Sequence, residues 1–570
     1  MGRGNVGRRP GRSWPKRLVD VYGSERAASI EPRIADLLPA RKIDPRAEPL
    51  WSEHDVWLIT YPDQFRRGDE PPLQTLRRMY SERLVDVFNG VHVLPFFPSS
   101  SDGGYSVTEY AMVDEAMGTW RDVEQLAAVT RLMVDAVINH ASVQGDWFRR
   151  WSEGDPGFEH FFRTAEPDSD LSTVVRAREH PLLTPFTTSR GKEWVWTTFS
   201  EDQADLDYRN PEVLLSVLRV LVSYIEHGVR VIRLDAIGFL WKEEGTSSIH
   251  LPQTHQIVQF LRAIVDEAFP GTMLLAEMNV PHLENVSYLG AAVPEAHAVY
   301  QFPLPPLTLY AYASEDATAL GTWLAANGSP RTGTTFVNFL ASHDGVGLRP
   351  VEDVLSVSDI ARLVDLALLS RGRVSSRSLP GGGTSPYELN ATWYDLVRGP
   401  TEGDDALQRH LGSHAIMLAI AGIPAIYVHS VFASRNDLSA VDGQSGPRAI
   451  NREKIDADGL SEQLGDPSSR ASLAAVAMSE MVGLRRSTAA FHPDAAQEVT
   501  NPARSVLSVH RVGSDGSTAT VLVNVSGTPV VVGGEGTERV YGRRIEQAPG
   551  LIQLGPWGYA WVLSDGHEAA

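Results

Sequence analysis

The sequence predicts an α/β protein built on an eight-stranded (β/α)8 TIM barrel with two inserted lobes and a small all-β C-terminal domain. Short apolar runs recur along the chain with helical patterns between them, and each run ends in polar or charged residues. There are eight such runs, which is the number of parallel strands that close this barrel. After about residue 490 the pattern changes to short alternating strands separated by glycine-rich turns.

The eight apolar runs are the expected barrel strands. They cover residues 56–61, 90–95, 132–139, 229–235, 273–277, 298–302, 335–340 and 423–428. Continuous apolar runs are typical of parallel strands, because helices cover both faces of such a sheet. Catalytic side chains of TIM barrels lie at the carboxyl ends of the strands, so Asp235, Glu277, His343 and Asp344 are expected at one rim.

The intervals between these runs predict the domain boundaries. They place an N-terminal extension at 1–50, the barrel at 51–140, 211–349 and 411–489, inserted lobes at 141–210 and 350–410, and the all-β domain at 490–570. The second lobe contains Gly381-Gly382-Gly383, a flexible stretch of the kind found in lids. In the C-terminal domain, strands are expected at 505–512 and 518–525.

Composition and charge exclude several classes of function. The 570 residues include 51 basic and 71 acidic side chains, and the resulting net charge of −20 disfavours binding to nucleic acid and anionic membranes. The absence of cysteine excludes disulfides, thiolate metal sites and a cysteine nucleophile, and fits a reducing cytoplasm. The basic N-terminus has no apolar region after it and is expected to be a solvated tail, and no run approaches the roughly 20 residues of a membrane span. We therefore expect a soluble, cytoplasmic protein.

Four segments at the predicted strand ends carry a family resemblance. They are Asp135-Ala-Val-Ile-Asn139-His140, Arg233-Leu-Asp235-Ala236, Glu277 after the fifth strand, and Ser342-His343-Asp344. In this order they resemble the signature regions of the α-amylase superfamily, glycoside hydrolase family 13. The resemblance runs from about Trp51 to beyond Arg452.

The residues support the same site on chemical grounds. Glycosidic cleavage with retention needs a nucleophilic carboxylate and a carboxylic acid about 5–5.5 Å apart, a spacing that neighbouring barrel strands can provide. Arg233 precedes Asp235 by two positions, so both side chains point the same way on a strand and the arginine keeps the carboxylate ionised. Asp235 is therefore the expected nucleophile. Glu277 leaves the apolar run 273–276, where burial raises a carboxyl pKa, and is the expected acid/base.

The resemblance assigns further roles at this rim. It implies that Asp344 binds sugar hydroxyls and stabilises the transition state, and that His140 and His343 hydrogen-bond the same glucose unit. The sequence has no HExxH motif, and His250 and His255 are too far apart in helical phase to share a face. We therefore expect neither a metal nor a cofactor.

Flanking segments resemble the sucrose phosphorylase subfamily. They are Val91-His-Val-Leu-Pro-Phe-Phe-Pro98, Asp102-Gly-Gly-Tyr105, Gln203-Ala-Asp-Leu206 and Asn451-Arg-Glu453. This resemblance implies that Asp102 and Arg452 hold the far hydroxyls of a terminal glucose and that Tyr105 stacks under the sugar ring. The full set of residues expected to bind the sugar is Asp102, Tyr105, His140, Gln203, Arg233, Phe239, His343 and Arg452.

Other stretches look more like glucosylglycerate phosphorylases than like sucrose phosphorylase. They are Phe239-Leu-Trp-Lys-Glu243, Ile249-His-Leu-Pro-Gln-Thr-His255, Asn279-Val-Pro-His282, Phe302-Pro-Leu-Pro-Pro306, Ser385-Pro-Tyr-Glu-Leu-Asn390 and the extension before Trp51. The resemblance implies retaining phosphorolysis, in which phosphate resolves a glucosyl enzyme and α-glucose 1-phosphate is formed. Met278 stands where a threonine is usual, and the segment 376–383 departs from the usual lid.

The acceptor stays open between glycerate, glycerol, fructose and fructose 6-phosphate, which correspond to glucosylglycerate, glucosylglycerol, sucrose and sucrose 6'-phosphate phosphorylases. An anionic acceptor needs a cationic fork. The candidates for the acceptor site are Arg178, Arg377 and Tyr387, with Arg176 and Arg373 nearby in the sequence. We expect small-molecule partners, a sugar and inorganic phosphate, and a monomer or a homodimer.

Two other functions use the same residues differently. A retaining α-glucosidase or transglucosidase would have the same carboxylates, and only a phosphorylase would form glucose 1-phosphate from donor and phosphate. A catalytically inactive carbohydrate-binding protein on a barrel scaffold is disfavoured by the intact Asp235, Glu277 and Asp344.

Overall fold

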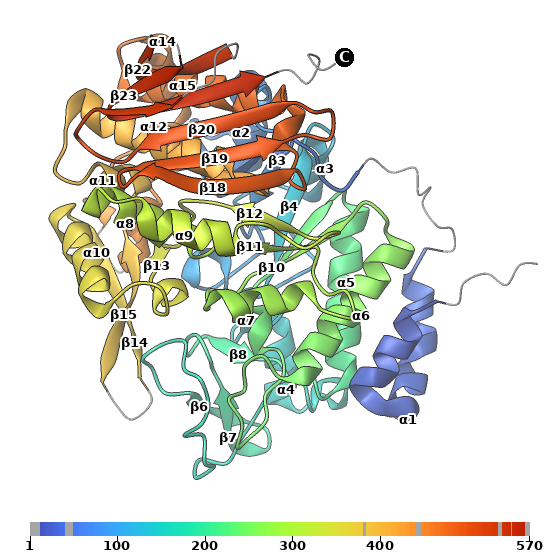
Figure 1. The fold of residues 1–570 in the computed structure, drawn as a ribbon. Helices are drawn as coiled ribbons and strands as arrows, with labels where there is room; N and C mark the ends of the chain where they lie inside the picture. The colour runs from blue at the N-terminus through green and yellow to red at the C-terminus, as the bar shows by residue number, and fades with distance from the viewer. Residues whose placement is uncertain are drawn as a thin grey trace, which may run out of the picture.

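The computed structural model describes residues 12–39, 49–379, 383–440, 446–533, 539–548 and 550–564. It confirms the predicted fold class, with a closed barrel of eight parallel strands at the centre of the molecule (Figure 1). The strands are β1 (Trp57–Thr60), β3 (Gly90–Val93), β4 (Arg131–Ala136), β9 (Val231–Leu234), β10 (Met273–Ala276), β11 (Ala298–Tyr300), β12 (Thr335–Asn338) and β16 (Ile423–Tyr427). Neighbours in the barrel follow one another along the chain, and β16 closes on β1.

The register of β9 and β10 places the two proposed catalytic carboxylates side by side. Leu234 pairs with Ala276, the last residue of the neighbouring strand. Asp235 and Glu277 are the next residue on each strand, so both leave the barrel at the same level. Neighbouring strands lie about 4.8 Å apart, which suits two groups that must reach one anomeric carbon.

Helices cover the outside of the barrel, and most of them follow a strand directly. The larger ones are α2 (Pro72–Met79), α3 (Trp120–Ala127), α5 (Pro211–Glu226), α6 (Pro252–Ala268), α8 (Leu304–Ser314), α9 (Thr318–Asn327), α12 (Gly403–Ala419) and α15 (Arg470–Arg486). Helix α5 starts at a proline, and the side chain of Asn210 before it accepts a hydrogen bond from the Glu212 amide. Both features fit a helix N-terminus, where the first amides lack partners within the helix.

Two lobes are inserted into the barrel. The first contains β5 (His140–Ser142), α4 (Asp146–Glu153), β6 (Leu183–Thr188), β7 (Gly191–Trp196) and β8 (Gln203–Asp205), and its β6–β7 hairpin lies at the bottom of Figure 1. The second contains β13 (Val346–Gly347), α10 (Val357–Leu369), β14 (Arg373–Ser378), β15 (Thr384–Asn390) and α11 (Trp393–Arg398). Gly381 and Gly382 of the expected flexible stretch lie outside the described residues.

The C-terminal domain is an antiparallel sheet, which confirms the predicted all-β fold (Figure 1). Its strands are β18 (Ala496–Ala503), β19 (Val506–Val512), β20 (Thr518–Asn524), β21 (Val530–Gly533), β22 (Arg539–Ala548) and β23 (Leu551–Ser564). Helix α12 packs between the barrel and this sheet, which explains why nearly all of its residues are buried. The buried Arg511 also joins the two parts, because its Nη1 donates a hydrogen bond to the Ala419 carbonyl at 2.9 Å.

The N-terminal segment forms a helix that the basic composition did not predict. Helix α1 (Trp14–Leu37) packs along α5 and α6, and Trp14, Leu18 and Ile34 are buried there. The helix bends at Gly23, whose φ of 77° is a conformation that glycine adopts without strain. The basic residues at the start of the chain obscured the apolar positions that pack this helix onto the barrel.

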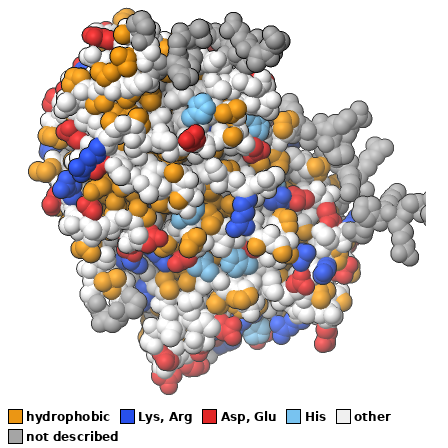
Figure 2. Space-filling view, in the orientation of Figure 1, with side chains coloured by type: hydrophobic (Ala, Val, Ile, Leu, Met, Phe, Trp, Pro, Cys, Tyr) orange, Lys and Arg blue, Asp and Glu red, His pale blue; other side chains and the backbone are white. Residues whose placement is uncertain are grey.

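The surface shows mixed charge. Acidic and basic side chains are interspersed over the described part of the face in Figure 2, without a continuous basic area. Within the described ranges, no helix is long and apolar enough to cross a bilayer.

Candidate active site

A pocket opens at the carboxyl ends of the barrel strands, between the two lobes. Residues from distant segments converge on it. Of the residues expected from the sequence, it is lined by Asp102, Tyr105, Arg178, His140, Gln203, Arg233, Asp235, Phe239, Glu277, His343, Asp344, Arg377 and Tyr387. Arg452 lines an adjoining, wider cavity that shares Asp102 and Gln203 with this pocket. The structure therefore brings the expected residues into one region.

Arg233 links the two central carboxylates. Its Nη1 lies 2.7 Å from Oδ1 of Asp235, and its Nη2 lies 3.8 Å from Oε1 of Glu277. The side chains of Asp235 and Glu277 are only 12% and 13% exposed. One guanidinium therefore faces two carboxyl groups in a nearly dry site, and it is closer to Asp235.

The pKa values of these groups follow from burial and from the position of Arg233. Burial raises the pKa of Glu277 to about 7, with Arg233 opposing the rise and Asp235 adding to it. Burial also raises the pKa of Asp235, and Arg233 counteracts this directly. Because Arg233 is nearer to Asp235, a single proton shared by the two carboxyls resides on Glu277. The arrangement favours an ionised Asp235 and a neutral Glu277 below a pH of about 7.

A strained backbone position also fixes Glu277. Ala236, directly after Asp235, has a φ of 48° and a ψ of 35°, which a residue with a side chain rarely adopts. In this conformation its amide donates a hydrogen bond to Oε2 of Glu277 at 3.1 Å. The turn after β9 thus positions the carboxyl group on the neighbouring strand.

The carboxylate of Asp135 pairs with the guanidinium of Arg233 and positions it. This carboxylate accepts hydrogen bonds from Arg233 Nη1 at 2.5 Å and pairs with Nε2 of His92 at 2.7 Å. Burial would raise the pKa of Asp135, but His92 and Arg233 outweigh burial and lower the pKa to about 2. The ionised Asp135 keeps the guanidinium charged and oriented toward the pocket.

On one side of the pocket, Arg448 joins three carboxylates. Its Nη1 lies 2.6 Å from Oδ1 of Asp344 and 4.0 Å from Asp102, and its Nε and Nη2 donate to Glu388 at 3.0 and 3.1 Å. Burial would raise the pKa of Asp344, but Arg448 and Arg452 lower it below its usual value. Arg448 and Glu388 are functional candidates that sequence reasoning missed.

The residues expected to clamp a glucose do not touch each other directly in the described structure. Asp102 accepts a hydrogen bond from the Gln203 amide at 3.3 Å, while Arg452 donates to the His343 carbonyl at 2.8 Å. Arg452 also lies 3.7 Å from Asp344. Any cooperation between Asp102 and Arg452 therefore has to pass through a bound sugar.

Three aromatic side chains near Asp102 already contact other protein groups. They are Tyr105, His140 and His343. The rings of Tyr105 and His343 stack at 5.0 Å, so a sugar ring can meet only the other face of Tyr105. His140 uses Nε2 to contact the Tyr105 carbonyl at 2.9 Å and Nδ1 to contact the Asn139 amide at 3.2 Å. A hydrogen bond from His140 to a sugar would have to replace one of these contacts. Burial lowers the pKa of His343 well below its usual value, so this ring is neutral.

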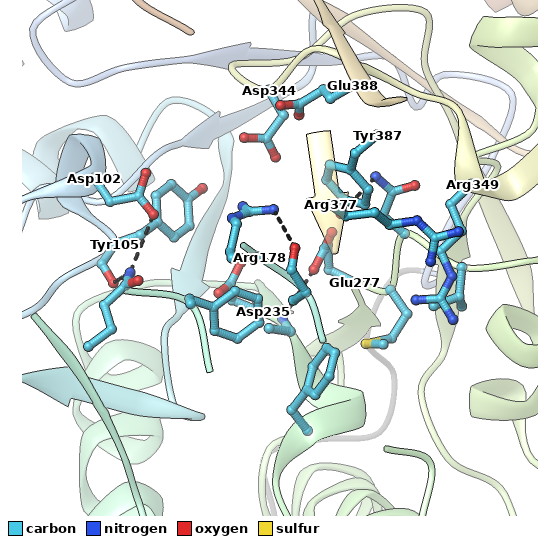
Figure 3. Close-up of a pocket in the computed structure, with 18 of the residues that line it drawn as sticks. Asp102, Tyr105, Arg178, Asp235, Glu277, Asp344, Arg349, Arg377, Tyr387 and Glu388 are labelled. Carbon is cyan, nitrogen blue, oxygen red and sulfur yellow. Dashed lines mark hydrogen bonds between the residues drawn. The ribbon is translucent and has the colours of Figure 1, made fainter. Parts of the chain in front are cut away.

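The opposite side of the pocket is cationic. In Figure 3, Asp102 and Tyr105 lie on one side of Asp235 and Glu277, whereas Arg349 and Arg377 lie on the other. Besides Arg233 and Arg448, the arginines lining the pocket are Arg176, Arg178, Arg349 and Arg377. Arg349, which sequence reasoning missed, follows β13 at the base of the second lobe.

The acceptor candidates from the sequence have different surroundings. Arg178 lies over the ring of Tyr387 at 5.4 Å, whereas Arg377 pairs with Glu352 at 2.8 Å. The Tyr387 hydroxyl receives a hydrogen bond from the Asn279 amide at 3.4 Å. Arg373 is exposed on β14 and does not line the pocket, so it is not a member of the cationic side.

His250 and His255, the two histidines considered for metal binding, both contact Tyr288. His250 precedes helix α6 rather than lying on it, so the argument from helical phase does not apply to it. Its Nδ1 contacts the Tyr288 hydroxyl at 2.7 Å, and the ring of His255 stacks on Tyr288 at 4.7 Å. Across the part of the chain that the structure describes, no group of His, Asp or Glu residues is arranged to hold a metal ion.

The barrel, the lobes and the paired carboxylates define a class of carbohydrate-active enzymes. The family described as the alpha-amylase catalytic domain matches residues 61–344, and the chain belongs to this family. It is 43% identical over 549 residues to glucosylglycerate phosphorylase of Allomeiothermus silvanus, with 95% of this chain and 97% of that protein covered. It is 41% identical over 553 residues to glucosylglycerate phosphorylase of Escherichia coli, with 96% and 98% covered.

A solved structure supports the fold. Sucrose 6F-phosphate phosphorylase from Thermoanaerobacter thermosaccharolyticum superimposes with a TM-score of 0.72. The two chains are 24% identical, and the match covers 83% of this chain and 94% of the other. At this identity the comparison establishes the shared architecture of barrel, lobes and C-terminal sheet.

Proposed function

We propose that this protein is a glucosylglycerate phosphorylase, a retaining enzyme that transfers glucose from an α-glucoside of glycerate to inorganic phosphate. The observation that carries the proposal is the polarity of the pocket, with Asp102 on one side of Glu277 and the arginines Arg349 and Arg377 on the other. A neutral glucose fits the side with Asp102 and Asp344. An anionic leaving group and phosphate fit the cationic side. The relatives from Allomeiothermus silvanus and Escherichia coli, both above 40% identity, carry this same name.

In the first half-reaction, the ionised carboxylate of Asp235 attacks C1 of the glucoside. The bond from C1 to the glycerate oxygen breaks, and Glu277 gives its proton to that oxygen. The products are an ester between C1 and Asp235, a free glycerate and a deprotonated Glu277. The pKa of Glu277, raised to about 7, supports its role as the acid, because a large fraction of the group is still protonated near neutral pH.

In the second half-reaction, phosphate enters the position that glycerate has left. Glu277 accepts a proton from the phosphate as one of its oxygens attacks C1, and the ester bond to Asp235 breaks. The product is α-glucose 1-phosphate, and both carboxyl groups return to their starting protonation states. Asp344 and Arg448 hold the hydroxyls of the glucose through both steps.

The acceptor residues divide between the two lobes. Arg178 comes from the first lobe, and Arg377 and Tyr387 come from β14 and β15 of the second. A guanidinium presents its donors in a planar fork that matches a carboxylate or a phosphate. This explains why arginine rather than lysine suits the anion side of such a pocket.

The test is a phosphorolysis screen. The purified protein is incubated with glucosylglycerate, glucosylglycerol, sucrose or sucrose 6'-phosphate, each with and without phosphate, and glucose 1-phosphate is measured. We expect phosphate-dependent glucose 1-phosphate from glucosylglycerate above all other donors. A preference for sucrose or glucosylglycerol would overturn the acceptor assignment. Equal glucose release with and without phosphate would instead establish a hydrolase.

A further inference from the structure

Arg349 and Arg377 lie next to each other on the cationic side of the pocket (Figure 3). Each is tied to a carboxylate that does not itself line the pocket. Arg377 Nη2 donates to both oxygens of Glu352 at 2.8 and 2.9 Å, and Arg349 Nη2 lies 3.5 Å from Oε2 of Glu284. The two glutamates hold the guanidinium groups from outside and leave their other edges toward the pocket.

Both guanidinium groups keep unused donors. In the described structure, Nε and Nη1 of Arg349 and Nη1 of Arg377 have no protein partner. The Nε of Arg377 is buried and also lacks a hydrogen bond within those residues. Burial lowers the pKa of Arg349, Glu284 opposes this, and the neighbouring Arg377 lowers it further. Although a glutamate pairs with each guanidinium, these free donors are left to hydrogen-bond an anion in the pocket.

The two half-reactions bring different anions to the same place. The glycerate oxygen leaves C1 along the line on which the phosphate oxygen later attacks, because both lie opposite the ester to Asp235. The carboxylate of glycerate is on the same three-carbon skeleton as the departing oxygen, and the remaining phosphate oxygens are one phosphorus atom away from the attacking one. Both anions therefore present charged oxygens to the same wall of the pocket.

We infer that Arg349 and Arg377 form one anion site, which takes the acceptor carboxylate in one half-reaction and phosphate in the other, and that Glu284 positions Arg349. This inference rests on the proposed function and extends it. It makes Arg349 a specificity-determining residue that distinguishes anionic from neutral acceptors. One cationic wall then serves both steps without a separate phosphate pocket.

The experiment uses α-glucosyl fluoride as the donor, so that one glucosyl enzyme is offered different acceptors. Transfer to glycerate, to phosphate and to neutral glycerol is measured for the wild type and for Arg349→Met. We expect the variant to raise KM for both glycerate and phosphate by about ten- to a hundredfold, the effect of losing a charged hydrogen bond. Transfer to glycerol and fluoride release without either anion should stay unchanged.

Further variants separate this role from a general loss of structure. Arg373→Met removes an exposed arginine of the same lobe and should leave all rates unchanged. Arg349→Lys keeps the positive charge but loses the planar pair of guanidinium donors. The KM values for glycerate and for phosphate should therefore lie between those of the wild type and those of Arg349→Met. Glu284→Gln should raise both KM values by less than Arg349→Met does, with kcat toward glycerol retained.

The outcomes distinguish this inference from the proposed function. If the wild type transfers glucose to phosphate but not to glycerate, the proposed function is wrong. If the wild type uses both anions but Arg349→Met changes KM for only one of them, the shared site is wrong. Equal losses with glycerol, glycerate and phosphate would make Arg349 a structural residue and would also overturn the inference.

Discussion

The guanidinium of Arg448 lies 2.6 Å from the carboxylate of Asp344 and forms two further hydrogen bonds to Glu388. Asp344 is a residue of the family signature, whereas Arg448 belongs to no motif recognised in the sequence. The orientation of Asp344 thus depends on a side chain about a hundred positions later in the chain. Mutations at Arg448 should affect both the proposed sugar site and the stability of the protein.

We predict that Arg448→Met lowers stability by about 3–5 kcal/mol, because it leaves the buried carboxylate of Glu388 without its cation. Thermal unfolding measures this. The double variant Arg448→Met/Glu388→Gln should recover part of the loss, since the uncompensated buried charge is removed. Additive losses in the double variant would contradict a direct partnership of Arg448 and Glu388.

Asp235→Ala should abolish formation of the glucosyl enzyme. No other carboxylate of the site lies at the end of β9, so the expected loss of turnover is about a thousandfold or more. Steady-state release of glucose 1-phosphate measures it, and trapping of the intermediate from α-glucosyl fluoride gives a second readout. An enzyme that keeps more than about a tenth of its turnover would end the assignment of Asp235 as the nucleophile.

Glu277→Gln should distinguish donors by the quality of their leaving group. Glycerate needs a proton as it departs, whereas fluoride needs little acid help, so the first step should be damaged mainly with glucosylglycerate. For the wild type, kcat/KM with glucosylglycerate should fall as the pH rises through about 7, where Glu277 loses its proton. With glucosyl fluoride as the donor, the rate of the first step should not fall as the pH rises through about 7. Equal damage with both donors would count against Glu277 as the acid.

Asp102 and Arg452 should act together only when sugar is bound. Since they make no direct contact in the described structure, the effects of Asp102→Ala and Arg452→Met on thermal stability should be additive. Their effects on kcat/KM for the donor should be less than additive, because both residues hold the same glucose. A double-mutant cycle measures both quantities, and additive losses in kcat/KM would show that the two residues bind independently.

Arg178→Ala should weaken the binding of anionic acceptors. Arg178 lies over Tyr387, and no carboxylate of the described residues pairs with it, so its charge is available to a ligand. We expect a rise in KM for glycerate with α-glucosyl fluoride as the donor, with transfer to neutral glycerol largely spared. An unchanged KM for glycerate would show that the acceptor does not bind at the first lobe.

The barrel could be predicted because parallel strands covered on both faces have a strong local signal. The run 273–277, for example, contains β10 (Met273–Ala276) and ends on Glu277. The carboxylates were recognisable because each one ends such a run. Arg349 and Arg448 were not, because a single arginine in a loop has no pattern that separates it from a solvated side chain. Only the closure of the barrel brings these arginines to the rim, where their charges acquire partners.

The position of Arg233 between Asp235 and Glu277 has a consequence for the whole catalytic cycle. Before reaction, the negative charge is on Asp235 and the proton on Glu277. In the proposed glucosyl enzyme, Asp235 is a neutral ester and Glu277 carries the charge. The total charge next to Arg233 is therefore the same in both states, and only its location moves by a few ångström across one guanidinium. The summed charge of the two carboxyl groups beside Arg233 therefore stays constant while one anion leaves the pocket and the next one enters.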